Sequence, residues 1–212
     1  MCCVRRAGLD SRSPRPAPLE CPPPSPPTSA PEPESMASHS PEKYAPVLTL
    51  EEFGRIREAK GDELGVVVAT SGGYDPIHPG HITCIVESQE FGDTLVVIVN
   101  GDSFLREKKG KPFQDLETRA AIVSGIRGVD YVVKFEIEGD STVAEALRVI
   151  RPRYFTKGGD RVKGKTMPPS EEAACREFGI ELVDGVGRDK IWSSTDFLTE
   201  WGRFWAKAHP EG

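Results

Sequence analysis

Two histidines next to a pair of glycines are the residues best suited to chemistry in this chain of 212 residues. The chain has four histidines, and His78 and His81 are two of them. They follow Gly72 and Gly73, and Gly80 lies between them. At positions i and i+3 both imidazoles project from one side of a helix's first turn, where free N–H groups and the helix dipole favour an anion. The pattern indicates a nucleotide-phosphate site in which the imidazoles support charge that builds up during group transfer.

The sequence around this stretch predicts a strand before the histidines and a helix after them. Residues 65–70 form a continuous apolar and β-branched run, which is typical of a central parallel strand buried on both faces. Pro79 suits the first position of a helix, and apolar residues continue one face of it to Gly92. The histidines are therefore expected at the carboxyl end of a buried strand.

Strands and helices alternate along the rest of the chain. Thr49 and Glu52 have the spacing of a capping box before a helix that Gly61 ends. Further strands are predicted at 94–100, 130–135, 152–157 and 180–183, with helices after them. This order predicts an α/β fold, a Rossmann-like open parallel sheet of five strands with helices on both faces. Ligands of such sheets bind at the carboxyl ends of the strands.

The segment after the predicted second strand is basic within an acidic protein. It contains Lys108, Lys109 and Lys111, which suit a substrate phosphate or a leaving pyrophosphate, and Arg119 follows with a planar fork for phosphate. A solvated surface is the alternative interpretation.

Two later loops offer further ligand contacts. The loop after the fourth strand permits close backbone approach and carries Lys157, Gly158, Gly159 and Asp160. The loop after the fifth strand leads into a helix start and carries Arg188, Ser193, Ser194 and Thr195. Hydroxyl groups and free N–H groups there indicate a second anion site facing the first. A simple turn and an ordinary capped helix are the alternatives.

The strand, loop and His-x-Gly-His helix resemble the cytidylyltransferase-like nucleotidyltransferase superfamily. Neither the P-loop pattern nor the dinucleotide-binding glycine pattern is present, which argues against a dehydrogenase. The Lys-Gly-Gly-Asp loop at 157–160 is close to that of the adenylyltransferase domain of bacterial ADP-heptose synthases, and glycerol-3-phosphate cytidylyltransferases are the second choice. The resemblance covers residues 47 to about 200.

The resemblance implies transfer of a nucleoside monophosphate from ATP, or CTP, to a sugar or polyol phosphate, with Mg²⁺ and release of pyrophosphate. It implies catalytic roles for His78, His81, Lys108 and Arg188. Acceptor phosphate would bind Lys109, Lys111 and Arg119. Nucleotide contacts would come from Gly72, Gly73, Tyr74, Gly80, Lys157, Gly158, Gly159, Asp160, Ser193, Ser194 and Thr195. An alcohol-phosphate cytidylyltransferase, or an inactive nucleotide-binding regulator, remains the alternative.

Composition argues against two kinds of partner. With 27 basic and 33 acidic residues the net charge is −6, whereas nucleic-acid and membrane surfaces usually attract a basic excess. No stretch reaches the ~18 apolar residues of a membrane span. Five cysteines without regular spacing indicate neither a disulfide framework nor a zinc site. We expect a cytoplasmic protein with no nucleic-acid or membrane partner and no protein-held metal.

The two ends of the chain differ from its middle. Residues 1–46 hold 12 of the 19 prolines and cannot bury enough apolar surface to offset the conformational entropy lost on folding, so we expect a disordered tail there. We expect one nucleotidyltransferase domain over 47–212. Translation from Met1 or from Met36 stays open. The predicted last helix carries more aromatic residues than one core stripe requires, which favours a homodimer; packing on the chain's own sheet is the alternative.

Overall fold

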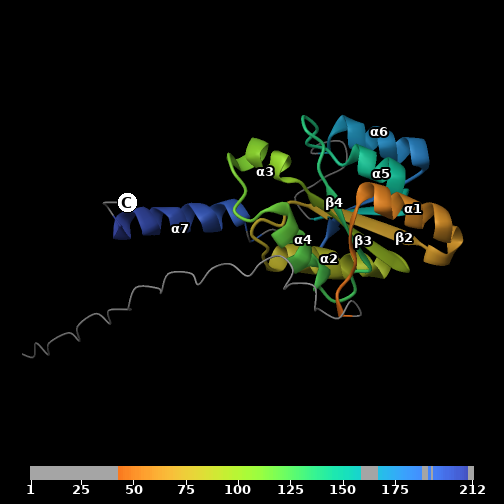
Figure 1. The fold of residues 1–212 in the computed structure, drawn as a ribbon, viewed down its shortest axis with the longest axis horizontal. Helices are drawn as coiled ribbons and strands as arrows, with labels where there is room; N and C mark the ends of the chain where they lie inside the picture. Colours follow the sequence, from red (N-terminus) through yellow and green to blue (C-terminus); the bar gives the residue numbers. More distant parts are fainter. Residues whose placement is uncertain (1–42, 159–166, 188–190, 192, 210–212) are drawn as a thin grey trace, which may run out of the picture. The chain divides into compact units, whose positions relative to one another are not determined.

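The computed structural model describes residues 43–158, 167–187, 191 and 193–209, and all of them fall in one compact unit, His39–Gly212. Within these residues six parallel strands form one sheet between two layers of helices. Figure 1 shows α1, α5 and α6 on one side of the sheet and α2 and α4 on the other. The α/β class and the Rossmann-like arrangement predicted from the sequence are confirmed.

The elements follow in the alternating order that the sequence predicts. The strands are β1 Val47–Thr49, β2 Val67–Gly72, β3 Thr94–Asn100, β4 Tyr131–Phe135, β5 Tyr154–Gly158 and β6 Glu181–Val186. The α-helices are α1 Leu50–Lys60, α2 Pro79–Ser88, α3 Asp102–Lys109, α4 Leu116–Ser124, α5 Ala144–Ile150, α6 Pro169–Phe178 and α7 Ser194–Ala208. Short 3₁₀ helices, η3 Gly61–Leu64 and η4 Gln89–Phe91, extend α1 and α2.

The strand order β1-β4-β3-β2-β5-β6 places β2 at the point where the chain changes direction. From β2 the chain moves outward through β3 and β4, and it then crosses to β5 and β6 on the other side of β2. The loops after β2 and β5 therefore leave the sheet toward opposite faces and open a crevice between them. This topology makes the carboxyl ends of β2 and β5 the position for a ligand.

Two elements differ from the sequence-based prediction. A sixth strand, β1, pairs with β4 at the sheet edge, from Val47 beside Val132 to Thr49 beside Lys134. Its three residues are too few to show a period, so only the pairing reveals it. The basic segment predicted as a loop begins instead as helix α3, whose Leu105 is buried. The capping box of Thr49 and Glu52 is confirmed, with Thr49 Oγ1 accepting from the Glu52 N–H.

The core has two parts, one on each face of the sheet. Alternation along β2 sends Val67 and Ala69 toward α1, α5 and α6, and Val68 toward α2 and α4. Phe155 of β5 lies in the first part and is fully buried. Each apolar cluster holds one helix layer against the sheet, so the strand ends that carry the polar residues are fixed from both sides.

Helix α7 is arranged differently from the other helices. Its residues Phe197, Trp201, Phe204 and Trp205 are between 42% and 59% exposed, and none of its described residues is buried. Figure 1 shows this helix leading away from the sheet. Packing of its aromatic face on the chain's own sheet is therefore not observed. Among the described helices, none has the length and apolar character that crossing a bilayer requires.

Candidate active site

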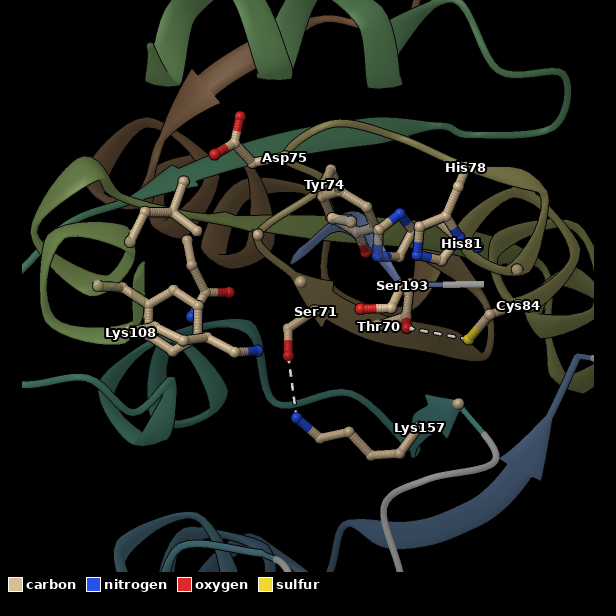
Figure 2. A pocket seen from close by; sticks show the side chains of 18 of the residues that line it. Thr70, Ser71, Tyr74, Asp75, His78, His81, Cys84, Lys108, Lys157 and Ser193 are labelled. Atoms are coloured by element: carbon tan, nitrogen blue, oxygen red, sulfur yellow. Dashed lines mark hydrogen bonds between the residues drawn. The ribbon is translucent and has the colours of Figure 1, made fainter. Parts of the chain in front are cut away.

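A cavity of about 430 Å³ opens at the carboxyl edge of the sheet, which is a size typical of small-molecule sites. Its walls come from the ends of β2, β3 and β5 and from α2, α3, α6 and the start of α7. Figure 2 shows the side chains that converge there. The predicted site residues that line it are Gly72, Gly73, Tyr74, His78, Gly80, His81, Lys108, Lys109, Lys157, Gly158, Ser193, Ser194 and Thr195.

His78 and His81 form a stacked pair at the first turn of α2. Their ring centroids lie 3.6 Å apart with an angle of 16° between the ring planes. His78 is the N-cap of α2, and its Nδ1 accepts a hydrogen bond of 3.3 Å from the His81 N–H. A neutral imidazole that accepts at Nδ1 carries its proton on Nε2. His78 therefore caps the helix with one ring nitrogen and can donate to a ligand with the other.

The glycines of the β2–α2 loop are required for space rather than for positive φ. A Cβ on Gly72 would lie 2.9 Å from the Tyr74 ring, and a Cβ on Gly73 would lie 2.9 Å from Leu105 of α3. The positive φ of this loop falls instead on Tyr74, at 51°. The Tyr74 ring is buried and meets His81 edge to face, with centroids 5.2 Å apart. Burial raises the pKa of its phenol well above the usual value, so Tyr74 is a neutral support for His81.

The start of α7 faces the start of α2. Ser193 is the N-cap of α7, and its hydroxyl accepts from the Asp196 N–H at 3.3 Å. Ser194 donates a hydrogen bond of 2.8 Å to the Pro76 carbonyl in the loop that precedes His78. Phe197 of α7 also meets the His78 ring at 6.2 Å between centroids. The N-termini of two helices, each carrying the positive end of a helix dipole, thus border the same cavity.

Asp75 organises the basic segment from within. Its carboxylate is fully buried and accepts hydrogen bonds of 2.8 Å from the N–H groups of Phe113 and Gln114. Lys109 donates to the Asp75 carbonyl and lines the cavity, while Lys108 lines it from the next position on α3. Burial lowers the pKa of Lys109, and the nearby Asp75 carboxylate opposes that shift. Asp75 is thus a structural residue that joins Lys109 and the segment after α3 to the β2–α2 loop.

Two predicted phosphate ligands do not reach the cavity. Arg119 is fully buried, and its guanidinium donates to the carbonyls of Gly73, Asn100 and Gln114 and to the carboxylate of Asp102. These hydrogen bonds join α4 to the ends of β2 and β3 and engage the whole guanidinium. The prediction that Arg119 binds substrate phosphate is therefore wrong. Lys111 is exposed and lies outside the cavity wall. Both predictions came from position in the sequence, which does not report side-chain direction.

Lys157 enters the cavity from the end of β5 in a buried position. Its ammonium donates a 3.0 Å hydrogen bond to the Ser71 hydroxyl and lies 3.3 Å from the Glu171 carboxylate. It also lies 4.2 Å above the Phe155 ring. The neighbouring candidates Gly159 and Asp160, and Arg188 near α7, lie outside the described residues.

The sequence-based reasoning missed several residues of the cavity wall. Ser71, Asn100 and Ser141 bring polar groups, and Phe104 and Cys84 bring apolar and thiol surface. Glu171 also lines the cavity. It comes from α6 and belongs to none of the motifs predicted from the sequence. For Ser71 and Asn100 a usable signal was their position at or next to the carboxyl end of a strand, because the carboxyl ends of parallel strands meet at one edge of the sheet. No local signal marks Glu171.

A sequence profile described as Cytidylyltransferase-like matches residues 69–199, which is more than half of the chain. The chain belongs to the cytidylyltransferase-like family. This assignment places it among nucleotidyltransferases, in agreement with the paired helix starts and the His-x-Gly-His motif at 78–81. The expected superfamily is confirmed.

Relatives of known name match the same part of the chain. The Bifunctional protein HldE of Aliarcobacter butzleri is 35% identical over 150 residues, and that of Wolinella succinogenes is 34% identical over 151 residues. These stretches cover 69% and 70% of this chain but only 30% and 31% of the relatives. The chain therefore spans less than a third of the length of these relatives.

Two solved structures share the architecture. The lipopolysaccharide core biosynthesis protein of Thermoplasma volcanium GSS1 has a TM-score of 0.50 and 29% identity, covering 58% of this chain and 98% of that protein. The pantoate-beta-alanine ligase of Francisella tularensis, crystallised in complex with beta-gamma ATP and beta-alanine, has a TM-score of 0.51, covering 73% of each chain. Its identity of 15% supports a common fold alone.

The described residues do not supply a complete metal site for a cytidylyltransferase-like protein. They contain no group of three His, Cys, Asp or Glu side chains that could hold an ion, and both oxygens of Asp75 are engaged by backbone N–H groups.

Proposed function

We propose that this chain transfers a nucleoside monophosphate from ATP, or from CTP, to a sugar or polyol phosphate and releases pyrophosphate. One observation carries the proposal. The stacked His78 and His81 at the start of α2 and the hydroxyls of Ser193 and Ser194 at the start of α7 border a single cavity. Two helix starts and two imidazoles around one space favour a polyphosphate ligand.

In the proposed reaction a phosphate oxygen of the acceptor attacks the α-phosphorus of the nucleotide in line. A bond forms between that oxygen and the α-phosphorus, and the bond from the α-phosphorus to the pyrophosphate oxygen breaks. An acceptor phosphate is already ionised at neutral pH, so no general base is needed. Catalysis then depends on positioning and on neutralising negative charge.

Each set of side chains has a role in this scheme. His78 and His81 hold the triphosphate and stabilise the charge that develops on it. Lys108 and Lys109 bind the acceptor phosphate or the leaving pyrophosphate as point charges on α3. The helix start at Ser193 closes the far side of the nucleotide, and Arg188, which lies outside the described residues, keeps the catalytic role that the family resemblance implies.

Sugar phosphate as the acceptor is supported by likeness to the relatives called HldE and by Lys157 and Gly158 of the Lys-Gly-Gly-Asp loop, which resembles that of ADP-heptose synthases. The same likeness favours ATP over CTP. An alcohol-phosphate cytidylyltransferase and a nucleotide-binding regulator without turnover are the competing functions.

The decisive experiment measures pyrophosphate release from ATP and from CTP with a panel of sugar, polyol and alcohol phosphates, using the full chain. Release with a sugar or polyol phosphate, lost in a folded His81→Ala variant, is the expected result. Normal turnover of the folded His81→Ala variant would sink the mechanism. Nucleotide binding by calorimetry without pyrophosphate from any acceptor would favour the regulator.

We further propose that the chain is a homodimer through the aromatic face of α7. Four aromatic side chains of this helix are roughly half exposed, and they lie on one side at helical spacing. Together they expose on the order of 400 Å² per chain, if each presents about half of its ~150–250 Å². Two such faces packed together would cover an exposed apolar patch of the size that often marks a functional surface.

A further inference from the structure

Side chains from the two faces of the sheet line different parts of one cavity, here called the histidine lobe, beside α2, and the second lobe, beside α5 and α6. Thr70 and Thr156 point toward α2, where Thr70 meets Cys84 and Thr156 meets Ser88. The next residues of these strands, Ser71 and Lys157, point to the opposite face by strand alternation. Figure 2 shows the two histidines and Cys84 to one side of Ser71, with Lys108 to the other and Lys157 reaching Ser71. The histidine lobe and the lobe beside α5 and α6 are thus distinct.

Glu171 brings a buried carboxylate to the second lobe. It lies in the first turn of α6, is 4% exposed and lines the cavity. Its Oε1 accepts a 3.1 Å hydrogen bond from the Val143 N–H before α5. Its Oε2 is buried, lies 3.3 Å from the Lys157 ammonium and accepts no hydrogen bond from any described residue. The ion pair with Lys157 compensates the charge of this carboxylate, and its Oε2 retains acceptor capacity that a ligand hydroxyl can fill.

The cavity that Glu171 lines also offers donors and groups that can act as either donor or acceptor. The Lys157 ammonium is a donor, and the hydroxyls of Ser71 and Ser141, which line the same cavity, act as either. A sugar hydroxyl also donates one hydrogen bond and accepts others, so neighbouring hydroxyls match such an array. Phosphate does not match it, because a second anion beside Glu171 would be repelled. The lobe therefore suits the neutral, polyhydroxylated part of a substrate.

We propose that Glu171, positioned by Lys157, accepts hydrogen bonds from hydroxyl groups of the acceptor and so selects a polyhydroxylated sugar phosphate over a short alcohol phosphate. This inference rests on the proposed nucleotidyl transfer. The histidine lobe holds the triphosphate, and Lys108 on α3 takes the acceptor phosphate, so the remainder of the acceptor extends toward Ser71 and Glu171. Lys157, predicted from the sequence as a nucleotide contact, becomes a positioning residue for the acceptor.

The competing explanation is structural, because the same contacts join β5, α5 and α6. If the pair is purely structural, a substitution in it should lower stability and change the KM values for nucleotide and acceptor alike. A specificity residue would instead affect the acceptor alone and would change the preference among acceptors. The measured quantity must therefore be discrimination between acceptors that differ by one hydroxyl.

The test compares kcat/KM for the sugar phosphate accepted in the pyrophosphate screen with kcat/KM for its monodeoxy analogues. In the wild-type chain at least one deoxy analogue is expected to lose about tenfold or more. Glu171→Gln is expected to raise the acceptor KM about tenfold and to leave the nucleotide KM unchanged. It should also reduce the ratio of kcat/KM values between the sugar phosphate and its deoxy analogue toward one. Glu172→Gln, its neighbour on α6 that pairs with Arg176, is the matched control and should behave as wild type.

Three results would overturn the inference. They are equal discrimination in Glu171→Gln and wild type, an equal rise of both KM values, and a wild-type preference for glycerol 3-phosphate. If Glu171→Gln does not fold, the wild-type deoxy series and Ser141→Ala, expected to weaken the same discrimination, still decide the question. Absence of pyrophosphate from every acceptor would instead refute the proposed function itself, which separates the two failures.

Discussion

His78 accepts a hydrogen bond at Nδ1 from the backbone N–H of His81, 3.3 Å away, while the two imidazoles stack with 3.6 Å between their centroids. The pair therefore caps the helix and, in the proposed function, also forms the triphosphate site. The cap orients His78, and the stack together with the Tyr74 edge orients His81. Preorganised donors of this kind need no rearrangement when a polyanion binds.

The double role of His78 can be separated by substitution. His78→Asn keeps a capping side-chain oxygen, so stability should stay near wild type while pyrophosphate release falls about 100-fold. His78→Ala should lose the same activity and also about 1 kcal/mol of unfolding free energy. Denaturant unfolding and turnover are measured on both variants. His209→Ala, at the exposed end of α7, is the control. Full activity of the folded Asn variant would show that His78 is only a cap.

Arg119 is expected to determine stability rather than substrate affinity. Arg119→Met leaves the carbonyls of Gly73 and Asn100 without their buried donor, which should cost about 3–5 kcal/mol of unfolding free energy. The same change at the exposed Arg153, whose partner Glu181 is also exposed, should cost less than about 0.5 kcal/mol. Denaturant melts provide the comparison. A stable Arg119→Met protein with a raised acceptor KM would restore Arg119 as a phosphate ligand.

Cys84 can report occupancy of the cavity. Burial raises the pKa of its thiol, so less thiolate is present at pH 7 than in a free cysteine, and alkylation should be slow and accelerate as pH rises through the shifted pKa. In a chain with Cys2, Cys3 and Cys21 changed to serine, saturating nucleotide should slow alkylation of Cys84 further. Cys175, which is buried outside the cavity, is the internal control. Equal rates with and without nucleotide would mean that the nucleotide binds elsewhere.

The α7 dimer predicts a specific effect of charge. Trp201→Glu places a carboxylate on the aromatic face, and burying it in an interface would cost several kcal/mol, so the chain should become monomeric. Thr199→Glu adds the same charge on the polar face and should leave the dimer intact. Light scattering after size exclusion gives the mass of each variant. A wild-type monomer at micromolar concentration would disprove the dimer.

Much of the fold could be read from local patterns. The capping box of Thr49 and Glu52, the buried run of β2 and the order of the later strands and helices depend on residues a few positions apart. The strand β1 was missed because three residues carry no period and are held only by pairing with β4. Helix α3 was missed because its basic residues suggested a loop and a single buried Leu105 anchors it.

The candidate site divides in the same way. By itself the sequence determined the His-x-Gly-His motif after a buried strand and the serines at a later helix start, because caps and glycines act over neighbouring residues. Only the tertiary structure decided that Arg119 clamps Gly73, 46 positions away, and that Asp75 binds Phe113, 38 positions away. The tertiary structure also placed Glu171 of α6 in the cavity wall. Such contacts depend on side-chain direction and strand order, which no local pattern encodes.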